Sequence, residues 1–378
     1  MRAFKFISLL VLIAMILTSC AGAGGAKEVK VSMLFPLTGD VSTFGISSKQ
    51  GVELAVEEWN AKGGINGLKI TTVVGESRCD AQEARNQATK VIEQDKVKFI
   101  IGEVCSSASI PVSEVANAKK VLQISPTSTN PKVTVDENGK HKPYTFRACF
   151  LDPFQGDVLA SFAYKEKGLK TAAILFDQGN DYVRGLAEYI KTAYEKLGGQ
   201  VKVYEAYGKD DTDFSAILAK VADAKVEVLF LPDYYPKVSL IGKQAKEKGI
   251  TAVMMGGDGW DSAELDRTAT DGGYFSNHYS PQDPRPIVQN FLKKYKEKYG
   301  AEPDALAVLA YDAANFLFTA IQETKSADPE KVKDTMMKIT VEGISGQIKM
   351  NETGDPIKAA AISQVTGGKI EFVKFVSP

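Results

Sequence analysis

The chain has 378 residues, which is longer than one ordinary hydrophobic core supports, so two domains are expected. Hydrophobic residues make up 44% and charged residues 25%, a composition that excludes a disordered chain and a multi-span membrane protein. The 46 lysine and arginine residues against 47 aspartate and glutamate residues leave no basic excess, so no nucleic-acid partner is expected.

The N-terminus has the pattern of an export signal. Basic residues in the first five positions precede an apolar run, Phe6 to Leu17, which suits a signal peptide and is too short to span a bilayer. Small residues then lead to Cys20, as in a bacterial lipobox. We therefore expect residues 1–19 to be a lipoprotein signal peptide, Cys20 to be lipidated and residues 20–28 to form a tether. A plain secretory signal that contains a cysteine is the alternative.

The rest of the chain alternates apolar strands with amphipathic helices. Strands are expected at 29–35, 68–74, 97–101, 121–125, 171–176, 201–207, 226–231 and 251–255. Helices are expected at 51–61, 81–94, 111–119, 155–167, 182–197, 214–222 and 237–248, with two long helices at 287–299 and 304–323 after a proline-rich linker. The strands are continuously apolar rather than alternating, which indicates α/β lobes with parallel sheets covered on both faces.

Export also affects how the remaining cysteines are interpreted. Cys79, Cys105 and Cys149 allow three pairings, each of which leaves one thiol over. We favour a Cys79–Cys105 disulfide, because both residues follow expected strands that would be neighbours in a parallel sheet and end on the same side. Cys149 would then be a free, buried thiol. Reduced thiols at the other two positions are the alternative.

Several short motifs follow one another between residues 37 and 259. They are Leu37-Thr38-Gly39, Asn60-Ala61-Lys62-Gly63-Gly64-Ile65, Ile101-Gly102-Glu103-Val104-Cys105-Ser106-Ser107, Ile124-Ser125-Pro126 with Thr129-Asn130-Pro131, and Gly256-Gly257-Asp258-Gly259. From about residue 29 onward, the chain thereby resembles the periplasmic leucine/isoleucine/valine-binding protein family, the amino-acid receptors of ABC importers. The resemblance implies one ligand in a cleft and a disulfide at positions that match the pairing favoured above.

The same resemblance implies the type I periplasmic binding protein fold, in which two doubly wound parallel-sheet lobes are joined by three hinge crossings. We expect an N-terminal lobe of residues 29–147 with 277–357. Residues 148–276 with 358–378 would form the C-terminal lobe. The crossings are expected near Arg147, near Asn277 and at residues 355–360.

Hydroxyl groups follow two neighbouring strands, at the edge where ligands bind in open parallel sheets. Ser106 lies between a strand and a helix, so its hydroxyl and the free N–H groups of the helix could hold a carboxylate without an arginine. By resemblance, Ser106 and Thr129 contact the carboxylate and ammonium groups of the ligand, and Thr127 contributes its main chain. The family typically has a small apolar residue at position 127. Helix capping is the alternative role for these hydroxyls.

The second lobe offers an acid and two tyrosines. Asp258, in a glycine-rich turn, is expected to face the ligand ammonium, because a desolvated amine needs an anionic partner. The branched-chain receptors have a glutamate here, and a plain turn aspartate is the alternative. Tyr182 and Tyr234 match family tyrosines that close over the ligand, or else have ordinary packing roles. Phe44 matches an aromatic wall of the side-chain pocket, to which the neighbouring Trp260 could add.

Enzyme motifs are missing from the sequence: there is no phosphate-binding P-loop, no G-x-S-x-G and no H-E-x-x-H. The chain has only two histidines, of which His141 lies in a basic turn and is expected to be solvated, and His278 is expected to be structural. We therefore expect neither a cofactor nor a metal, and no enzymatic activity.

The sequence as a whole predicts a monomeric receptor that binds a small or branched-chain aliphatic amino acid and delivers it to an ABC permease and ATPase complex. It would lie in the cell envelope, attached only by its lipid, on the outer side of the cytoplasmic membrane or in the periplasm. The carried-over positions include no spare arginine or lysine, so dicarboxylates are disfavoured. A chemosensory receptor without a transport role and a secreted hydrolase are the alternatives.

Overall fold

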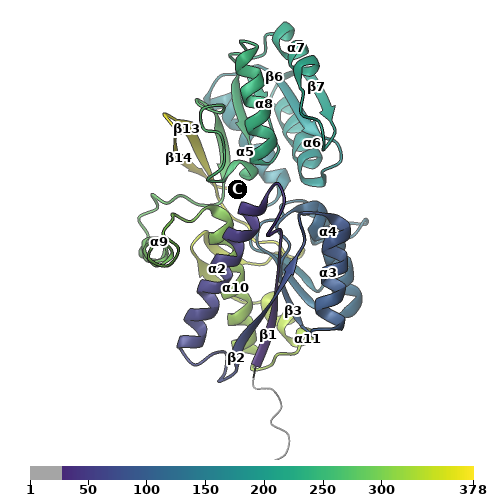
Figure 1. The fold of residues 1–378 in the computed structure, drawn as a ribbon, viewed down its shortest axis with the longest axis vertical. Helices are drawn as coiled ribbons and strands as arrows, with labels where there is room; N and C mark the ends of the chain where they lie inside the picture. The colour runs from purple at the N-terminus through teal and green to yellow at the C-terminus, as the bar shows by residue number, and fades with distance from the viewer. Residues whose placement is uncertain (1–27) are drawn as a thin grey trace, which may run out of the picture.

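The structure, a computed structural model, describes residues 28–378. The expected signal peptide, Cys20 and all of the tether except Glu28 lie outside the described residues. The described chain forms two lobes that follow one another along the long axis of the molecule (Figure 1). Each lobe is a β-sheet covered by helices, which confirms the predicted α/β class.

The first lobe is built on a five-stranded sheet with the order β2-β1-β3-β4-β5, in which every pair of neighbours is parallel. Its strands are β1 (Glu28–Phe35), β2 (Lys69–Glu76), β3 (Phe99–Gly102), β4 (Leu122–Ser125) and β5 (Thr145–Arg147). Its helices are α2 (Ser42–Ala61), α3 (Ala81–Glu93), α4 (Ser106–Lys119), α10 (Ala305–Thr324) and α11 (Pro329–Met336). The central strands β3 and β4 are buried along their whole length, as expected for a sheet covered on both faces.

Helix α2 begins at Ser42, well before the predicted start at residue 51. The buried residues of its first half are mainly glycine and serine, so apolar periodicity does not reveal this part of the helix. A Cβ atom at Gly51 would lie only 2.1 Å from the carbonyl oxygen of Ala307 on α10. Small residues therefore let α2 pack closely along α10. The first turn of α4, which is rich in serine, escaped prediction in the same way.

Helix α10 is long and apolar enough to cross a membrane by length and composition alone. However, 78% of its apolar window is buried inside the structure, where it packs along α2 (Figure 1). The helix is therefore part of the first lobe's core.

The second lobe is built on a seven-stranded sheet with the order β14-β13-β10-β9-β8-β6-β7. Its strands are β6 (Thr171–Asp177), β7 (Gln200–Tyr207), β8 (Val228–Phe230), β9 (Val253–Gly256), β10 (Tyr274–Asn277), β13 (Ala360–Thr366) and β14 (Lys369–Val376). Its helices are α5 (Asp152–Ser161), which continues as a π-helical turn, α6 (Asp181–Lys196), α7 (Ser215–Ala224) and α8 (Tyr235–Glu247).

One edge of this sheet differs from the wholly parallel prediction. Strand β13 runs antiparallel to both β10 and β14, and β13 and β14 form a hairpin. The hairpin turn contains Gly367 and Gly368, both with positive φ. A two-glycine turn between apolar runs is a hairpin signal, so the sequence did contain the information for this element.

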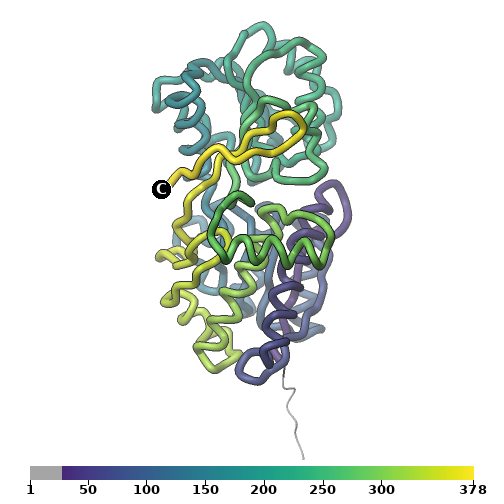
Figure 2. Tube along the Cα trace, turned by 90° about the vertical axis from the view of Figure 1, so that its left-hand side faces the viewer, coloured from purple at the N-terminus to yellow at the C-terminus, as the bar shows by residue number. Residues whose placement is uncertain are grey.

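The chain passes between the two sheets in three places: after β5, after β10 and before β13. After β10 it returns to the first lobe through α9 (Pro286–Tyr299) and α10, and a small hairpin of β11 (Thr340–Gly343) and β12 (Gly346–Lys349) follows α11. Figure 2 shows the last passage in yellow, where the C-terminal segment runs from the lower lobe to the upper one. Because the crossings come from distant parts of the sequence, they form a hinge and not a single flexible linker.

A buried ion pair joins two of these crossings. The Arg147 guanidinium contacts the Asp355 carboxylate, and both side chains are almost completely buried. Arg147 also donates hydrogen bonds to the carbonyl oxygens of Ser128 and Asn130 and to the Thr134 hydroxyl. The hinge therefore supports the segment after β4, where the predicted site residues Thr127 and Thr129 lie.

The predicted disulfide between Cys79 and Cys105 is present, with its Cα atoms 5.6 Å apart. Within residues 28–378, Cys149 is buried and has no disulfide partner. The disulfide joins the loop after β2 to the residue that precedes α4. It therefore fixes the turn from which Ser106 projects.

Replacing Arg147 with methionine should lower the free energy of unfolding by about 3–5 kcal/mol, because the Asp355 carboxylate would be left buried without its partner. Arg147→Met combined with Asp355→Asn should recover part of this loss. Arg85→Met, which breaks an exposed pair with Glu114, should change stability by less than about 1 kcal/mol. Denaturant unfolding measures all three. A loss for Arg147→Met no larger than that for Arg85→Met would contradict this account of the hinge.

Candidate functional site

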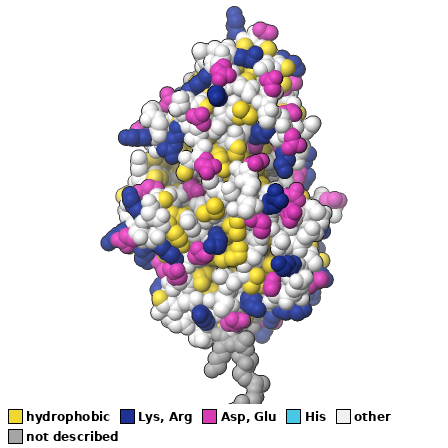
Figure 3. Space-filling view, viewed as in Figure 1, with side chains coloured by type: hydrophobic (Ala, Val, Ile, Leu, Met, Phe, Trp, Pro, Cys, Tyr) yellow, Lys and Arg dark blue, Asp and Glu magenta, His cyan; other side chains and the backbone are white. Residues whose placement is uncertain are grey.

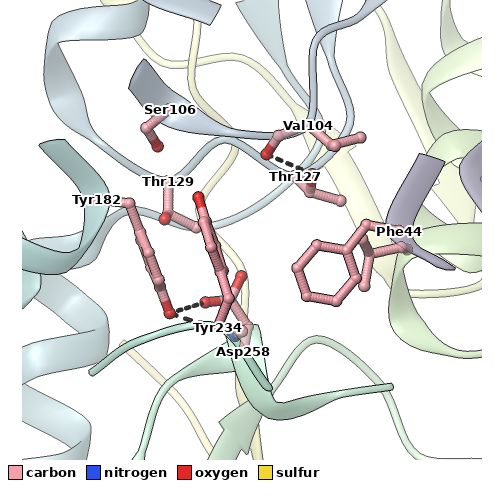
Figure 4. A pocket seen from close by; sticks show the side chains of 10 residues that line it. Phe44, Val104, Ser106, Thr127, Thr129, Tyr182, Tyr234 and Asp258 are labelled. Carbon is pink, nitrogen blue, oxygen red and sulfur yellow. Dashed lines mark hydrogen bonds between the residues drawn. The ribbon is translucent and has the colours of Figure 1, made fainter. Parts of the chain in front are cut away.

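A pocket lies between the lobes and brings together all seven residues predicted to bind the ligand (Figure 4). About 300 Å³ of space, part of it open to solvent, lies between the atoms that line it. From the first lobe it is lined by Phe44, Val104, Ser106, Thr127, Thr129 and Leu306. From the second lobe it is lined by Tyr182, Tyr234, Asp258 and Gly259.

The polar part of the first-lobe side of the pocket consists of hydroxyl groups at the carboxyl ends of β3 and β4. Ser106 is the first residue of α4, where backbone N–H groups have no helical partner. The Thr127 hydroxyl donates to the Val104 carbonyl oxygen at 3.0 Å, so it is already engaged. The Thr129 hydroxyl is buried and has no hydrogen-bond partner within the described residues. Thr129 and the N-terminus of α4 can therefore receive a polar group of a ligand.

Glu103 accepts several hydrogen bonds that fix the first-lobe side of the pocket. Its carboxyl group accepts hydrogen bonds from the Ser77 hydroxyl at 2.7 Å and from the Cys105 backbone N–H. Its backbone carbonyl oxygen accepts from the hydroxyls of Ser109 and Ser125 at 2.8 and 2.7 Å. Burial raises the pKa of Glu103 to about 8, so its side chain is protonated at neutral pH and adds no negative charge beneath the hydroxyls.

The second-lobe side of the pocket is centred on Asp258, whose side chain is 11% exposed. Its Oδ1 accepts hydrogen bonds from Gln155 Nε2 and the Tyr182 hydroxyl, both at 2.8 Å. Its Oδ2 lies 2.9 Å from His278 Nε2. Burial alone would raise the pKa of Asp258, but the hydrogen bond and charge interaction with His278, together with the hydrogen bonds from Gln155 and Tyr182, hold the pKa below its usual value. The pocket therefore contains a buried negative charge.

The glycines around Asp258 are required by close packing. A Cβ at Gly257 would lie 2.4 Å from the Tyr182 hydroxyl oxygen, and a Cβ at Gly256 would lie 2.0 Å from Trp260 Nε1. Trp260 is fully buried beneath the turn and donates to the Leu231 carbonyl oxygen at 2.9 Å. The suggestion that Trp260 adds to the pocket wall is therefore wrong: its ring supports the turn from behind.

Aromatic rings form the side of the pocket between its polar ends. Tyr182 and Tyr234 are stacked, with ring centroids 5.2 Å apart and an interplanar angle of 7°. Phe44, from the other lobe, meets the Tyr234 ring edge-on at 5.5 Å. With Val104 and Leu306, these rings provide an apolar surface for a short side chain.

Direct hydrogen bonds across the cleft show that the lobes are closed. Asn130 Nδ2 donates to the Asp181 carbonyl oxygen, and the Asp181 N–H donates to the Ser107 hydroxyl, both at 2.8 Å. On the other side of the pocket, the Tyr235 hydroxyl donates to the Asp40 carbonyl oxygen at 2.8 Å. Residues of both lobes can therefore contact one small ligand at the same time.

Sequence reasoning missed several residues of the site. Gln155, on α5, and His278, after β10, contact Asp258. No local sequence motif predicts either contact. Leu306 lies in the first turn of α10, far along the chain, and only the packing of α10 places it at the pocket. The expectation that His141 is solvated is wrong: it is half-buried, with its Nε2 2.9 Å from the Thr145 carbonyl oxygen.

Comparisons with known proteins agree with this geometry. Residues 28–369 match the profile of a family described as periplasmic binding protein. The chain is 32% identical over 333 residues to a leucine-, isoleucine-, valine-, threonine- and alanine-binding protein of Pseudomonas aeruginosa, with 87% of each chain covered. It is 35% identical over 338 residues to a Leu/Ile/Val-binding protein homologue of Brucella abortus, with 89% of each covered.

Solved structures show the same similarity. A leucine-binding protein from Thermotoga maritima is 37% identical with a TM-score of 0.88, covering 93% of this chain and 99% of that one. A branched-chain amino acid transporter substrate-binding protein from Streptococcus pneumoniae, in complex with isoleucine, is 29% identical with a TM-score of 0.86. That alignment covers 93% of this chain and 100% of the other.

Replacing Glu103 with glutamine should make the protein less sensitive to alkaline pH. Because the folded-state pKa is about 8 and the unfolded value is near 4.3, the folded state binds the extra proton. The free energy of unfolding therefore decreases as the pH rises between these two pKa values, by up to about 4 kcal/mol. Urea unfolding at about pH 5 and about pH 9 should show a smaller loss in Glu103→Gln than in the wild type. Glu297→Gln, on the exposed surface of α9, should behave like the wild type, and equal losses in all three proteins would disprove the assignment.

Proposed function

This chain belongs to the periplasmic binding protein family, and on that premise we propose that it is the extracytoplasmic receptor of an ABC importer. Its ligand is a small or branched-chain aliphatic α-amino acid, which binds between the lobes and is delivered to the permease. The protein is a receptor rather than an enzyme.

The observation that carries the proposal is the opposite polarity of the two ends of one closed pocket. One end has hydroxyl and N–H donors around Ser106 and Thr129, and the other has the buried carboxylate of Asp258. A zwitterionic α-amino acid has a carboxylate and an ammonium group on one carbon atom, so it satisfies both ends at once. An uncompensated carboxylate would be costly to bury without such a partner.

The lining residues restrict the ligand's side chain. Phe44, Val104 and Leu306 are apolar, and no lysine or arginine is among the described residues that line the pocket. A second carboxylate on the ligand would lack a cationic partner and lose its hydration. The limited space between the lining residues also favours a short aliphatic chain. The names of the relatives from P. aeruginosa and T. maritima, and the isoleucine in the S. pneumoniae structure, support this ligand class.

Closure links binding to delivery. Contacts to both lobes exist only when the cleft is closed, so a ligand that makes them shifts the population toward the closed form. The permease could thereby distinguish a loaded receptor from an empty one. Basic and acidic side chains are interspersed over the face shown in Figure 3, without a large patch of one sign that would suggest a nucleic-acid partner.

We also propose that lipidated Cys20 attaches the receptor to the membrane. The carboxyl ends of the parallel strands of the first lobe point toward the cleft, so Glu28, at the start of β1, lies at the opposite end of the lobe. A tether that enters at this end leaves the cleft accessible to the ligand and the permease.

Replacing Asp258 with asparagine should weaken L-leucine binding by about 30-fold or more, because the ligand ammonium would lose its anionic partner. Isothermal titration calorimetry on the purified, ligand-free protein measures this directly. Asp334→Asn, at an exposed position on α11, should bind leucine like the wild type. Tight leucine binding by Asp258→Asn would show that the ammonium is held elsewhere.

A further inference from the structure

His278 contacts Asp258 from the hinge side of the cleft. It follows β10, in the segment that crosses back to the first lobe, and only 3% of its surface is exposed. Its ring is stacked on Phe150 with 3.8 Å between ring centroids, which fixes its orientation. We propose that His278 positions Asp258 for the ligand ammonium, and that protonation of His278 in acid releases the ligand. This inference rests on the proposed function.

The hydrogen bonds of Asp258 show why His278 matters more than an ordinary neighbour. A carboxylate offers about four acceptor positions, two on each oxygen. Oδ1 already receives hydrogen bonds from Gln155 and Tyr182, whereas Oδ2 receives one from His278 alone. The position left for the ligand ammonium is therefore on Oδ2, the oxygen whose direction is set by His278.

The protonation state of His278 decides how much negative charge the ligand meets. A neutral imidazole donates its Nε2–H to Oδ2 and leaves the charge of Asp258 uncompensated. A protonated imidazole would form an ion pair with the same oxygen, at the observed 2.9 Å separation. The ammonium would then meet a neutralised acid with a second cation next to it, in a buried environment where charge interactions are strong.

The structure leaves a position for the additional proton. When Nε2 carries the hydrogen, Nδ1 is the atom that accepts a proton in acid. Nδ1 has no hydrogen-bond partner within the described residues. His278 also lines a second pocket, which is bordered by Ser345 and Lys358. His278 thus lies between the ligand pocket and the hinge.

The surroundings of the ring set the direction of its pH response. Burial lowers the pKa of His278, the carboxylates of Asp258 and Asp261 oppose this, and the Lys358 ammonium adds to the lowering. His278 is therefore neutral at neutral pH. Other titratable or charged groups on the elements around the ring are Arg147, Cys149, Asp152, Tyr279, Asp283, Arg285 and Asp312. The affinity for the ligand should have its full value at pH values above the ordinary pKa range of histidine. It should fall as the pH drops through the lowered pKa of His278.

The test compares three histidine variants of the full chain by calorimetry with L-leucine between about pH 7.5 and about pH 5. In the wild type, the dissociation constant should rise by more than about threefold toward the acid end. His278→Gln keeps an N–H donor but cannot be protonated. It should bind within about threefold of the wild type at the neutral end and lose less than about threefold in acid. His278→Leu, which has no donor, should bind weakly throughout the range.

His141 provides the matched control, since it is the chain's only other histidine. His141→Gln should keep the wild-type pH dependence. It also leaves His278 as the only imidazole, so its NMR signal can be followed without further assignment. Because linkage is reciprocal, leucine should lower the pKa of His278 that this signal reports. The decrease in pKa should equal the logarithm of the ratio between the limiting dissociation constant at low pH and that at neutral pH.

The outcomes separate this inference from the proposed function. A wild-type protein that binds no leucine at any pH would overturn both. Leucine binding with the same pH dependence in the wild type and His278→Gln would overturn the role of His278 alone. If His278→Gln does not fold, the NMR titration in His141→Gln decides: a His278 pKa unaffected by leucine rules the inference out.

Discussion

The central constraint of this structure is the carboxylate of Asp258, which is held ionised in a closed cleft. Three hydrogen bonds orient it, yet no cation within the described residues faces it on the ligand side. Closing the lobes over this charge favours a ligand that supplies a positive charge next to it. The rest of the second-lobe site follows from this requirement: the glycines of the turn admit Tyr182, and Trp260 packs beneath them to hold the turn in place.

The first lobe meets the complementary requirement without any charged side chain at the pocket. A ligand carboxylate there would meet N–H groups at the start of α4 and the hydroxyls of Ser106 and Thr129, arranged by a protonated Glu103 and by Arg147 at the hinge. Because Glu103 carries no charge at neutral pH, the negative end of the ligand is not repelled. The two lobes thus offer opposite polarity across one small apolar pocket, and the hinge that joins them also supports both halves of the site.

Most of the site residues that directly follow a strand could be predicted from the sequence. Ser106, Thr127, Thr129 and Asp258 follow strands directly, and parallel strands bring their carboxyl ends to the same edge of a sheet, so local pattern and resemblance were sufficient. The missed features depend on packing between distant segments. The first half of α2 buries glycine and serine against α10, which removes its apolar periodicity. Gln155 and His278 contact Asp258 only because of how α5 and the hinge are arranged. The residues next to them in the sequence form no pattern that predicts these contacts.

The most direct test of the account is a crystal structure of the protein with L-leucine. We expect one leucine between the lobes, with its carboxylate at Ser106, Thr129 and the N-terminus of α4, and its ammonium at hydrogen-bond distance from Asp258 Oδ2. Its side chain should lie against Phe44, Val104 and Leu306. A leucine bound in the opposite orientation, or bound to one lobe only, would contradict the claim that a zwitterion is held between a donor-rich lobe and a buried acid.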